Sequence, residues 1–320
     1  NFSKKNHYLN LKLYLKIYDK IYYKELIIRI LVAGSSGVIG KSVVPKISDF
    51  GSIHEINKTS KPNQNCTILD LTNLNDVKHF IAKEDYFDVF IFFAGLAHSK
   101  GSNATKDLHI KTNYKSLKFC IDSMKKYNKV PNKIIFASTI SVYGEDKKTE
   151  YFHETTNLKP VSPYAVSKVY AEKYLVSNFS KNFWILRFAP VYCHGFYLNI
   201  HRRTKINNIF YKPGNGQRKL SLCNILNISL VVSAILKNNI PSGIYNLSDD
   251  HEYTYNDLLK KVGAINVKSI PYFIFRFTYM LGKVFKINFL IENSIKLLTD
   301  NLYPSKKIQK YVSLDYNLFD

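Results

Sequence analysis

A short apolar run that leads directly into a glycine-rich turn constrains the fold of this 320-residue chain more than any other feature. Residues 27–33 are almost entirely apolar, as expected for a strand that is covered on both faces of a sheet. Residues 34–40 follow with the sequence Gly-Ser-Ser-Gly-Val-Ile-Gly and open a helical stretch. A strand, a glycine turn and a helix in this order predict one unit of a parallel sheet, with a helix N-terminus that can bind phosphate.

The three glycines of this turn have different expected roles. Gly34 would permit the tight turn, Gly37 would let the backbone approach a pyrophosphate, and Gly40 would let the helix pack closely on the strand. Glycines alone are weak evidence, because any connection between a strand and a helix can contain them. Their position directly after a buried strand supports the prediction of a dinucleotide site.

Strands alternate with helical stretches up to about residue 190. Further buried strands are predicted at residues 88–93, 133–137 and 183–188, which indicates an α/β fold with a Rossmann-like, doubly wound parallel sheet. After Pro190 the regularity fades into a segment rich in Tyr, Lys, Asn and Gly. We therefore expect an N-terminal extension outside the fold at 1–25, an NAD(P)-type dinucleotide-binding domain at 26–190, and a smaller, mainly substrate-binding C-terminal domain at 191–320.

The net charge of +22 invites a nucleic-acid interpretation, which the make-up of that charge argues against. Only six of the 46 basic residues are Arg, and the Lys residues occur along the whole chain together with many Asn, Ile and Tyr. A nucleic-acid face more often contains Arg and is localised. We expect a Lys-rich solvated surface that suits anionic substrates, and no nucleic-acid partner.

Neither the cysteines nor the hydropathy pattern indicates a metal site or a membrane span. The four cysteines are widely spaced and form no C-x-x-C pair, which favours a reducing cytoplasm and no bound metal. The aromatic-rich stretch 271–290 is interrupted by Arg276, Lys283 and Lys286, so we expect no membrane span. Residues 1–25 carry six Lys and apolar residues at helical spacing, and we interpret them as an extension rather than a membrane-surface helix.

Tyr164 and Lys168 are the candidate chemical centre. Because they lie four residues apart on a predicted helix, their side chains share one face. A fixed ammonium beside the phenol would lower the pKa of Tyr164 toward the operating range, so that the tyrosine could act as a base. The pattern alone is weak in a chain with 24 Tyr, but the hydroxyl pair Ser138-Thr139 ends a predicted strand upstream of it.

With these residues in place, the chain from about residue 27 to residue 311 resembles the NAD-dependent epimerase/dehydratase family of extended short-chain dehydrogenases/reductases. Within that family the resemblance is to the UDP-sugar 4-epimerases. The spacing G-x-x-G-x-x-G of the turn is the one typical of the family. Four further segments agree with it: Asp70-Leu71, Phe93-Ala94-Gly95-Leu96-Ala97, Asn113 and Arg187-Phe188-Ala189-Pro190-Val191-Tyr192.

The resemblance implies NAD as the cofactor. The family usually has an Asp for the adenosine ribose at the end of the second strand, where this chain has Asn57 and Lys58. Since a Lys could instead meet a 2′-phosphate, NADP is not excluded. The residues that the resemblance assigns to the cofactor are Gly34, Ser36, Gly37, Val38, Ile39, Gly40, Asn57, Lys58, Asp70, Leu71, Phe93, Ala94, Gly95, Leu96, Lys168 and Phe188.

The same resemblance implies a catalytic role for five residues. Tyr164 would take the proton from the sugar C4 hydroxyl as the C4 hydride passes to the nicotinamide. Lys168 would hold the nicotinamide ribose and lower the pKa of the tyrosine. Thr139 would bind the same sugar hydroxyl with Ser138 as helper, and Asn113 would belong to the framework of the site.

The residues after Thr139 indicate which other reactions of the family are expected or disfavoured for this chain. Sugar-nucleotide 4,6-dehydratases typically have Asp-Glu there, whereas this chain has Ile140-Ser141, so dehydration is disfavoured. A 3,5-epimerase would place a Cys near Ser141, and none is present. We therefore expect a UDP-hexose or UDP-N-acetylhexosamine 4-epimerase for polysaccharide precursors. An NAD(P)H-dependent reductase of 4-keto nucleotide sugars and a non-catalytic RNA-binding member of the fold are the alternatives.

The substrate half of the site is less well marked. Asn199 fits the position of an Asn that meets the substrate phosphate in relatives. Relatives that act on N-acetylated sugars have an Arg-Ser-Leu segment, to which Leu220-Ser221-Leu222 corresponds, with Arg218 just upstream. Asn199, Arg218 and Ser221 are therefore the expected substrate-binding residues, and the resemblance makes a homodimer possible.

Overall fold

A seven-stranded parallel sheet forms the centre of the computed structural model, which describes residues 28–59, 65–97, 104–144, 146 and 148–320. The expected extension at 1–25 lies outside these residues. All neighbouring strands pair in parallel. In spatial order the strands are β3 (Cys66–Ile68), β2 (Gly51–Asn57), β1 (Ile28–Ala33), β4 (Val89–Phe92), β5 (Lys133–Thr139), β6 (Phe183–Phe188) and β12 (Gly243–Leu247).

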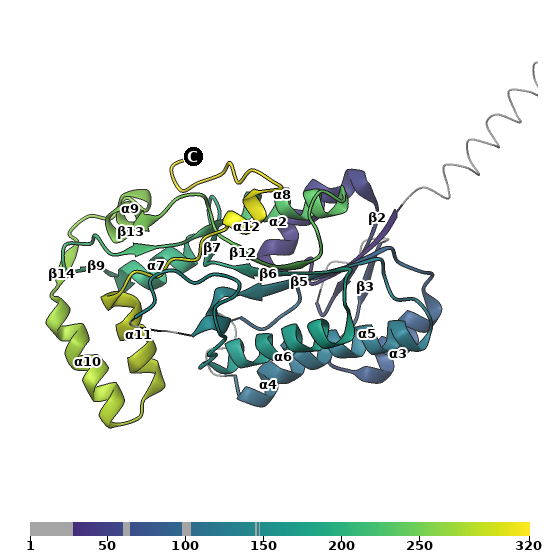
Figure 1. Cartoon of the computed structure of the whole chain (residues 1–320), viewed down its shortest axis with the longest axis horizontal. Coiled ribbons are helices and arrows are strands. Elements are labelled where there is room, and N and C mark those ends of the chain that lie inside the picture. The colour runs from purple at the N-terminus through teal and green to yellow at the C-terminus, as the bar shows by residue number, and fades with distance from the viewer. Residues whose placement is uncertain (1–27, 60–64, 98–103, 145, 147) are drawn as a thin grey trace, which may run out of the picture.

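Helices cover both faces of this sheet (Figure 1). Along β1, Ile30 and Val32 join the hydrophobic core on one face, whereas Leu31 and Ala33 join the core on the other. The first face is covered by α2 (Val38–Ile47), α8 (Ile225–Leu236) and α12 (Lys306–Gln309). The opposite face is covered by α3 (Leu74–Lys83), α4 (Lys106–Ile110), the π-helical turn η3 (Lys111–Lys115), α5 (Ser116–Lys126) and α6 (Pro163–Asn178).

The sequence-based prediction of a Rossmann-like, doubly wound sheet is therefore confirmed. The chain first moves outward from β1 to β3 and then returns to β4 on the other side of β1, so the switch in strand order lies between β1 and β4. Ligands of such sheets bind at the carboxyl ends of the strands beside this switch. The glycine turn after β1 and the segment after β4 both lie there.

Two strands of the sheet were not predicted from the sequence. β3 has only three residues, and β12 comes from the C-terminal part of the chain and pairs with β6. Together with α8 and α12, β12 returns the chain to the large sheet after residue 190. The division at residue 190 stays a prediction, but the two parts are interleaved along the sequence.

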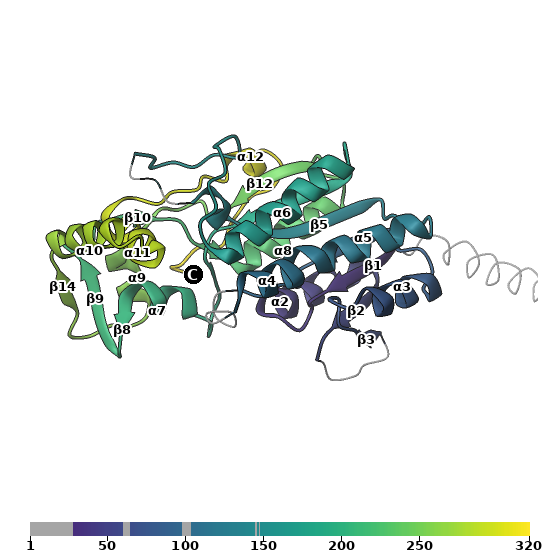
Figure 2. The same cartoon turned by 90° about the horizontal axis from the view of Figure 1, so that it is seen from below.

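The remaining C-terminal segments lie together at one end of the sheet (Figure 2). They share a small core that includes Tyr192, Leu222 and Tyr253. No helix in the described ranges combines the length and the apolar character needed to cross a bilayer. The elements are β7 (Val191–Tyr192), α7 (Leu198–Thr204), β8 (Lys205–Ile206), β9 (Ile209–Pro213), β10 (Lys219–Leu220), β11 (Cys223–Asn224), β13 (Tyr253–Thr254), α9 (Tyr255–Lys261), β14 (Lys268–Ile270), α10 (Tyr272–Val284) and α11 (Asn288–Leu298).

Candidate active site

The glycine turn between β1 and α2 has the geometry expected of each glycine. Gly34 has a φ of +88°, and a Cβ there would lie 2.5 Å from the backbone nitrogen of Ala94. A Cβ on Gly40 would lie 2.4 Å from Cα of Ser35, so the helix can pack this closely only without a side chain. A Cβ on Gly37 would meet only the carbonyl oxygen of Gly34, at 3.4 Å, so the backbone is open there to an incoming group.

The N-terminus of α2 can receive a diphosphate. Gly37 is its N-cap residue and offers no side chain to the first backbone N–H groups of the helix. Those N–H groups and the helix dipole favour an anion at this position. The turn therefore fits the pyrophosphate of a dinucleotide cofactor. The N–H of Gly37 donates to the carbonyl of Gly34 at 3.2 Å, so Val38 and Ile39 would hold the pyrophosphate through their backbone N–H groups.

The end of β2 supports this turn from the side. The Asn57 side chain accepts a hydrogen bond from the backbone N–H of Ser36 at 2.9 Å and donates one to the hydroxyl of Ser35 at 2.7 Å. Asn57 is buried, with 4% of its surface exposed. The residue expected to face the adenosine ribose thus fixes the conformation of the glycine turn, a contact that the sequence analysis did not foresee.

Lys58 and Asp70 form an ion pair beside the same turn, with 2.9 Å between Nζ and Oδ2. Partial burial would raise the pKa of Asp70, but Lys58 and two hydrogen bonds from Thr72 lower it to about 2. The pair places one positive and one negative charge at two residues that the resemblance assigns to the cofactor. The choice between NAD and NADP stays a prediction.

The segment after β4 runs along the floor of the site. A Cβ on Gly95 would lie 3.1 Å from Oδ1 of Asn113 and 3.4 Å from Nζ of Lys168. Asn113 is fully buried, accepts a hydrogen bond from the backbone N–H of Leu96 at 2.6 Å and donates one to Ser167 at 2.9 Å. It lies in the π-helical turn η3, a local irregularity that often marks functional positions. Asn113 therefore joins the predicted cofactor segment to the helix that carries the candidate centre.

Tyr164 and Lys168 both project from α6. Ser162 caps this helix by accepting a hydrogen bond from the N–H of Ala165, which fixes Tyr164 in its first turn. The hydroxyls of Tyr164 and Thr139 are hydrogen-bonded. Nζ of Lys168 donates to the carbonyl oxygen of Ala137 at 2.7 Å and lies 6.0 Å from the centre of the Tyr164 ring.

Burial is the largest influence on the pKa values of Tyr164 and Lys168. It raises the pKa of Tyr164 to about 12, although the hydrogen bond with Thr139 lowers it. Burial also lowers the pKa of Lys168 to about 7, against the raising effect of Glu172. In this structure burial outweighs the hydrogen bond with Thr139 in setting the pKa of Tyr164, and the lowering of that pKa by Lys168 stays a prediction.

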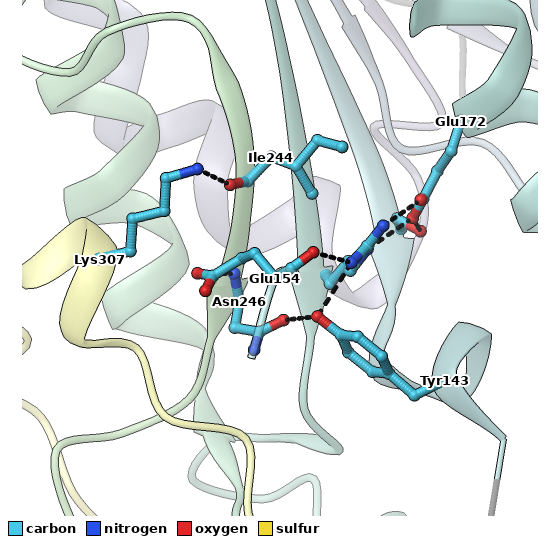
Figure 3. A network of polar contacts seen from close by, with 8 residues as sticks. Tyr143, Glu154, Glu172, Ile244, Asn246 and Lys307 are labelled. Carbon is cyan, nitrogen blue, oxygen red and sulfur yellow. Dashed lines mark hydrogen bonds and ion pairs between the residues drawn. The ribbon is translucent and has the colours of Figure 1, made fainter. Parts of the chain in front are cut away.

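A buried polar network behind Lys168 was missed by the sequence analysis. Glu172 pairs with Arg187, with 2.7 Å between Oε2 and Nη2, and each side chain is 3% exposed. Glu172 also accepts a hydrogen bond from Ser138, so the predicted helper of Thr139 has its hydroxyl directed to this carboxylate. Tyr143 accepts from Arg187 at 2.9 Å and donates to Asn246 at 2.6 Å (Figure 3). The position of Glu172, four residues after Lys168 on one helix face, was the available signal.

A pocket lies where the end of the sheet meets the C-terminal part. Of the three predicted substrate residues, only Ser221 lines it. The side chain of Asn199 donates to the carbonyl of Val191 at 2.8 Å, and Arg218 pairs with Asp300 at 3.7 Å. The lining residues are Ile140, Pro190, Arg203, Leu220, Ser221, Tyr255, Lys296, Asn301 and Tyr303.

Replacement of Gly34 by alanine is expected to destabilise the fold by at least about 2 kcal/mol, because the left-handed backbone is strained and the methyl group would collide with Ala94. NAD affinity should fall in parallel. Gly263→Ala is the matched control, since Gly263 has a φ of +60° but no atom within 4 Å of a Cβ. Urea unfolding measures the loss of unfolding free energy in each of the two variants. Equal losses in both would contradict a steric role of Gly34.

The pH dependence of stability is expected to reveal the buried ammonium. Because the pKa of Lys168 is about 7 in the native state and 10.5 ordinarily, the unfolded chain binds an extra proton between these values. The free energy of unfolding therefore increases with pH across this window. Denaturant unfolding of the wild type and of Lys168→Met should give curves whose difference changes from pH 7 to pH 10. Parallel curves would show that Lys168 keeps its ordinary pKa.

A glycine turn at the switch point of a doubly wound sheet, with a Tyr, Lys and Thr group beside it, defines a dinucleotide-dependent enzyme of the short-chain dehydrogenase/reductase type. The family comparison agrees with this class. The model of the NAD dependent epimerase/dehydratase family matches residues 30–247, and the chain belongs to that family.

The individual proteins that this chain resembles have low sequence identity to it or match only a part of it. A UDP-glucose 4-epimerase 3 of Oryza sativa subsp. japonica is 31% identical over 105 residues, which are 33% of this chain and 27% of the plant protein. The UDP-Glc/GlcNAc 4-epimerase of Campylobacter jejuni is similar in structure, with 19% identity, a TM-score of 0.71 and coverage of 92% of this chain and 95% of that one. A dTDP-4-dehydrorhamnose reductase of Bacillus anthracis in complex with NADP has 17% identity, a TM-score of 0.61 and coverages of 77% and 84%. These structural likenesses show the fold.

Proposed function

We propose that this protein is an NAD-dependent 4-epimerase of UDP-hexoses or UDP-N-acetylhexosamines that supplies precursors for polysaccharides. The observation that carries the proposal is the convergence of Tyr164, Thr139 and Lys168 at the carboxyl end of β5. Epimerisation at C4 needs a base for one hydroxyl, a hydrogen-bond partner for it and a hydride acceptor. The first two are supplied by side chains of this chain.

In the proposed reaction, Tyr164 takes the proton from the C4 hydroxyl of the sugar. Thr139, whose hydroxyl is bonded to that of Tyr164, holds the same sugar oxygen in line. When bound, NAD supplies a hydride acceptor at C4 and the positive charge of its nicotinamide ring. Lys168 holds the nicotinamide ribose and adds an ammonium beside the phenol. These two positive charges oppose the effect of burial on the pKa of Tyr164.

The lining of the pocket at the edge of the sheet favours an anionic ligand, although its volume of about 30 Å³ would have to open for a nucleotide sugar. Arg203 and Lys296 bring positive charge to it, and Ser221 lies in its wall. A diphosphate would be held by these cations, with the sugar toward Ile140 and the adjoining Thr139. Asn199 and Arg218 lie outside this lining, and we propose them as contacts only for a part of the nucleotide that extends beyond the pocket.

Hydride return distinguishes the epimerase from a reductase of 4-keto nucleotide sugars. A reductase uses the same Tyr164, Lys168 and Thr139 but releases its product after one transfer, and the Bacillus anthracis likeness shows that such enzymes share the fold. The fully buried Asn113 is hydrogen-bonded to both backbone groups of Leu96, which favours a rigid segment after β4 of the kind that an epimerase needs to retain its cofactor between half-reactions.

The decisive experiment is to incubate the purified chain with UDP-galactose or UDP-N-acetylgalactosamine. An epimerase produces the gluco epimer with no net change in NADH absorbance, and denaturation of the protein releases NAD. If no epimer forms while NAD(P)H is oxidised in proportion to an added 4-keto nucleotide sugar, the reductase is the correct assignment.

We also propose a cytoplasmic location, where UDP-sugars are made. The four cysteines, all within the described residues, form no disulfide, and burial raises the pKa of Cys120 to about 12 and that of Cys223 well above its usual value. Thiols of this kind are stable in a reducing compartment. The homodimer stays a prediction that sedimentation velocity can test.

A further inference from the structure

Helices α10 and α11 form a hairpin that projects from the C-terminal part of the molecule (Figure 1). One face of α10 packs on α11. Phe275 and Gly282 are buried there, and Thr278 is hydrogen-bonded to Ser294 of α11 at 2.8 Å. A Cβ on Gly282 would lie 2.9 Å from the Ile291 side chain, so the two helices are in close contact. This face satisfies the ordinary need of a surface helix for one apolar side.

The opposite face of α10 is also apolar, and it is exposed. Phe273, Phe277, Met280 and Val284 follow one another at helical spacing and are 68%, 59%, 62% and 72% exposed. Phe285 in the turn to α11 and Phe289 in the first turn of α11 are also exposed, at 67% and 72%, and we call these two residues and the row on α10 the apolar ridge. Isolated exposed apolar residues are normal, but a contiguous row of this kind indicates an interaction surface.

Cations border the apolar ridge. Arg276 and Lys283 lie seven residues, about two turns, apart on the same flank of the row, and Lys286 lies in the turn at its end; all three are exposed. The only acidic residue between positions 271 and 299 is Glu292. Long basic side chains beside an apolar row can extend to a charged boundary while the row enters an apolar phase.

We propose that the apolar ridge docks on a membrane surface that contains anionic lipids. Such a surface offers an apolar layer for Phe277, Met280 and Val284 and negative headgroups for the bordering cations. The chain's net charge of +22 strengthens attraction to an anionic surface. A second copy of the chain fits less well, because an isologous contact would bring the same cations of both copies together.

Vesicle co-sedimentation of the full-length protein tests this proposal. Vesicles of phosphatidylcholine with about one third phosphatidylglycerol should bind at least about tenfold more protein than phosphatidylcholine alone. The variant Phe277→Ser/Met280→Ser/Val284→Ser should lose about a hundredfold in affinity for the anionic vesicles, because three large apolar side chains no longer leave water. Its melting temperature should stay near that of the wild type, since all three side chains are exposed.

The matched control removes as many exposed apolar side chains elsewhere. Ile68→Ser/Ile206→Ser/Ile209→Ser changes residues that are 58%, 53% and 55% exposed, and it should bind vesicles like the wild type. A Phe277→Trp variant adds a direct signal, because the only native tryptophan, Trp184, is 6% exposed and its emission should not change. The emission of Trp at position 277 should shift to the blue when anionic vesicles are added.

Three results would overturn the proposal. The first is equal vesicle binding by the wild type and the ridge variant, which would mean that the general positive charge acts without the ridge. The second is an unchanged emission from the tryptophan variant in the presence of vesicles. The third is a wild-type dimer that the ridge variant converts to a monomer, without vesicle binding, which would make a second copy the occupant. None of these depends on the sugar substrate, so the proposed enzymatic function is tested separately.

Discussion

Replacement of Tyr164 by phenylalanine is expected to reduce kcat for the interconversion of UDP-sugar epimers by about a thousandfold, the effect typical of a lost general base. The phenol hydroxyl is hydrogen-bonded to Thr139 and lies on the helix face of Lys168, whereas the ring packs against His109 with 6.2 Å between centroids. Phenylalanine keeps this ring contact. The fold and the retained NAD should therefore be unchanged while turnover is lost.

The control for this variant is Tyr170→Phe on the same helix, at a side chain that is 42% exposed. Its kcat should match that of the wild type. Both variants are measured by the rate of epimer formation and by the NAD released on denaturation. A Tyr164→Phe protein that keeps kcat within about tenfold of the wild type would exclude the tyrosine as the base, and one that has also lost NAD would indicate a structural role.

Replacement of Glu172 by alanine is expected to lower the free energy of unfolding by about 3–5 kcal/mol, because a buried guanidinium is left without its counter-charge. Arg187 would lose its ion pair and Ser138 its acceptor, and both are buried. The change should also act on the active site. Since Glu172 raises the pKa of Lys168, its removal should lower that pKa further and move the pH profile of the reaction toward acid.

The exposed pair of Lys219 and Glu252 provides the comparison. Its side chains are 48% and 38% exposed, so Glu252→Ala should cost less than about 1 kcal/mol and leave the pH profile unchanged. Urea unfolding and the pH dependence of kcat measure the two effects of each variant. If Glu172→Ala and Glu252→Ala prove equally mild, the buried pair contributes nothing that a surface pair does not.

The fold could be predicted from the sequence because its signals are local. The strand at 28–33 has apolar residues on both faces, and a Cβ on Gly40 would meet Ser35, only five positions away. The clash at Gly34 is not local, because a Cβ there would meet Ala94 after the neighbouring strand β4. The spacing of Tyr164 and Lys168 on a helix follows from 3.6 residues per turn. β3 has only three residues, too few for a period to be recognised, and β12 lies after residue 190, where the regular alternation of strands and helices has faded.

The site could be predicted only in part, because several of its contacts join residues far apart in the chain. Asn57 was expected to face the cofactor ribose, but it meets the turn at Ser35 and Ser36 across 22 and 21 positions. Ser138 was expected beside the sugar, but its hydroxyl meets Glu172 across 34 positions. The hydrogen-bond partner of a side chain depends on which polar groups the tertiary packing places near it. A local sequence pattern does not contain that information.

The sequence by itself determined the alternation of strands and helices up to about residue 190, the glycine turn and the helical face that carries Tyr164 and Lys168, because backbone preferences and helix period are local properties. The tertiary structure decided the protonation of that pair. Burial raises the pKa of Tyr164 to about 12 and lowers that of Lys168 to about 7, and Glu172 partly opposes the second effect. It also decided which face of α10 stays uncovered. Solvation is lost or kept only when distant segments pack together, and a local pattern does not contain that information.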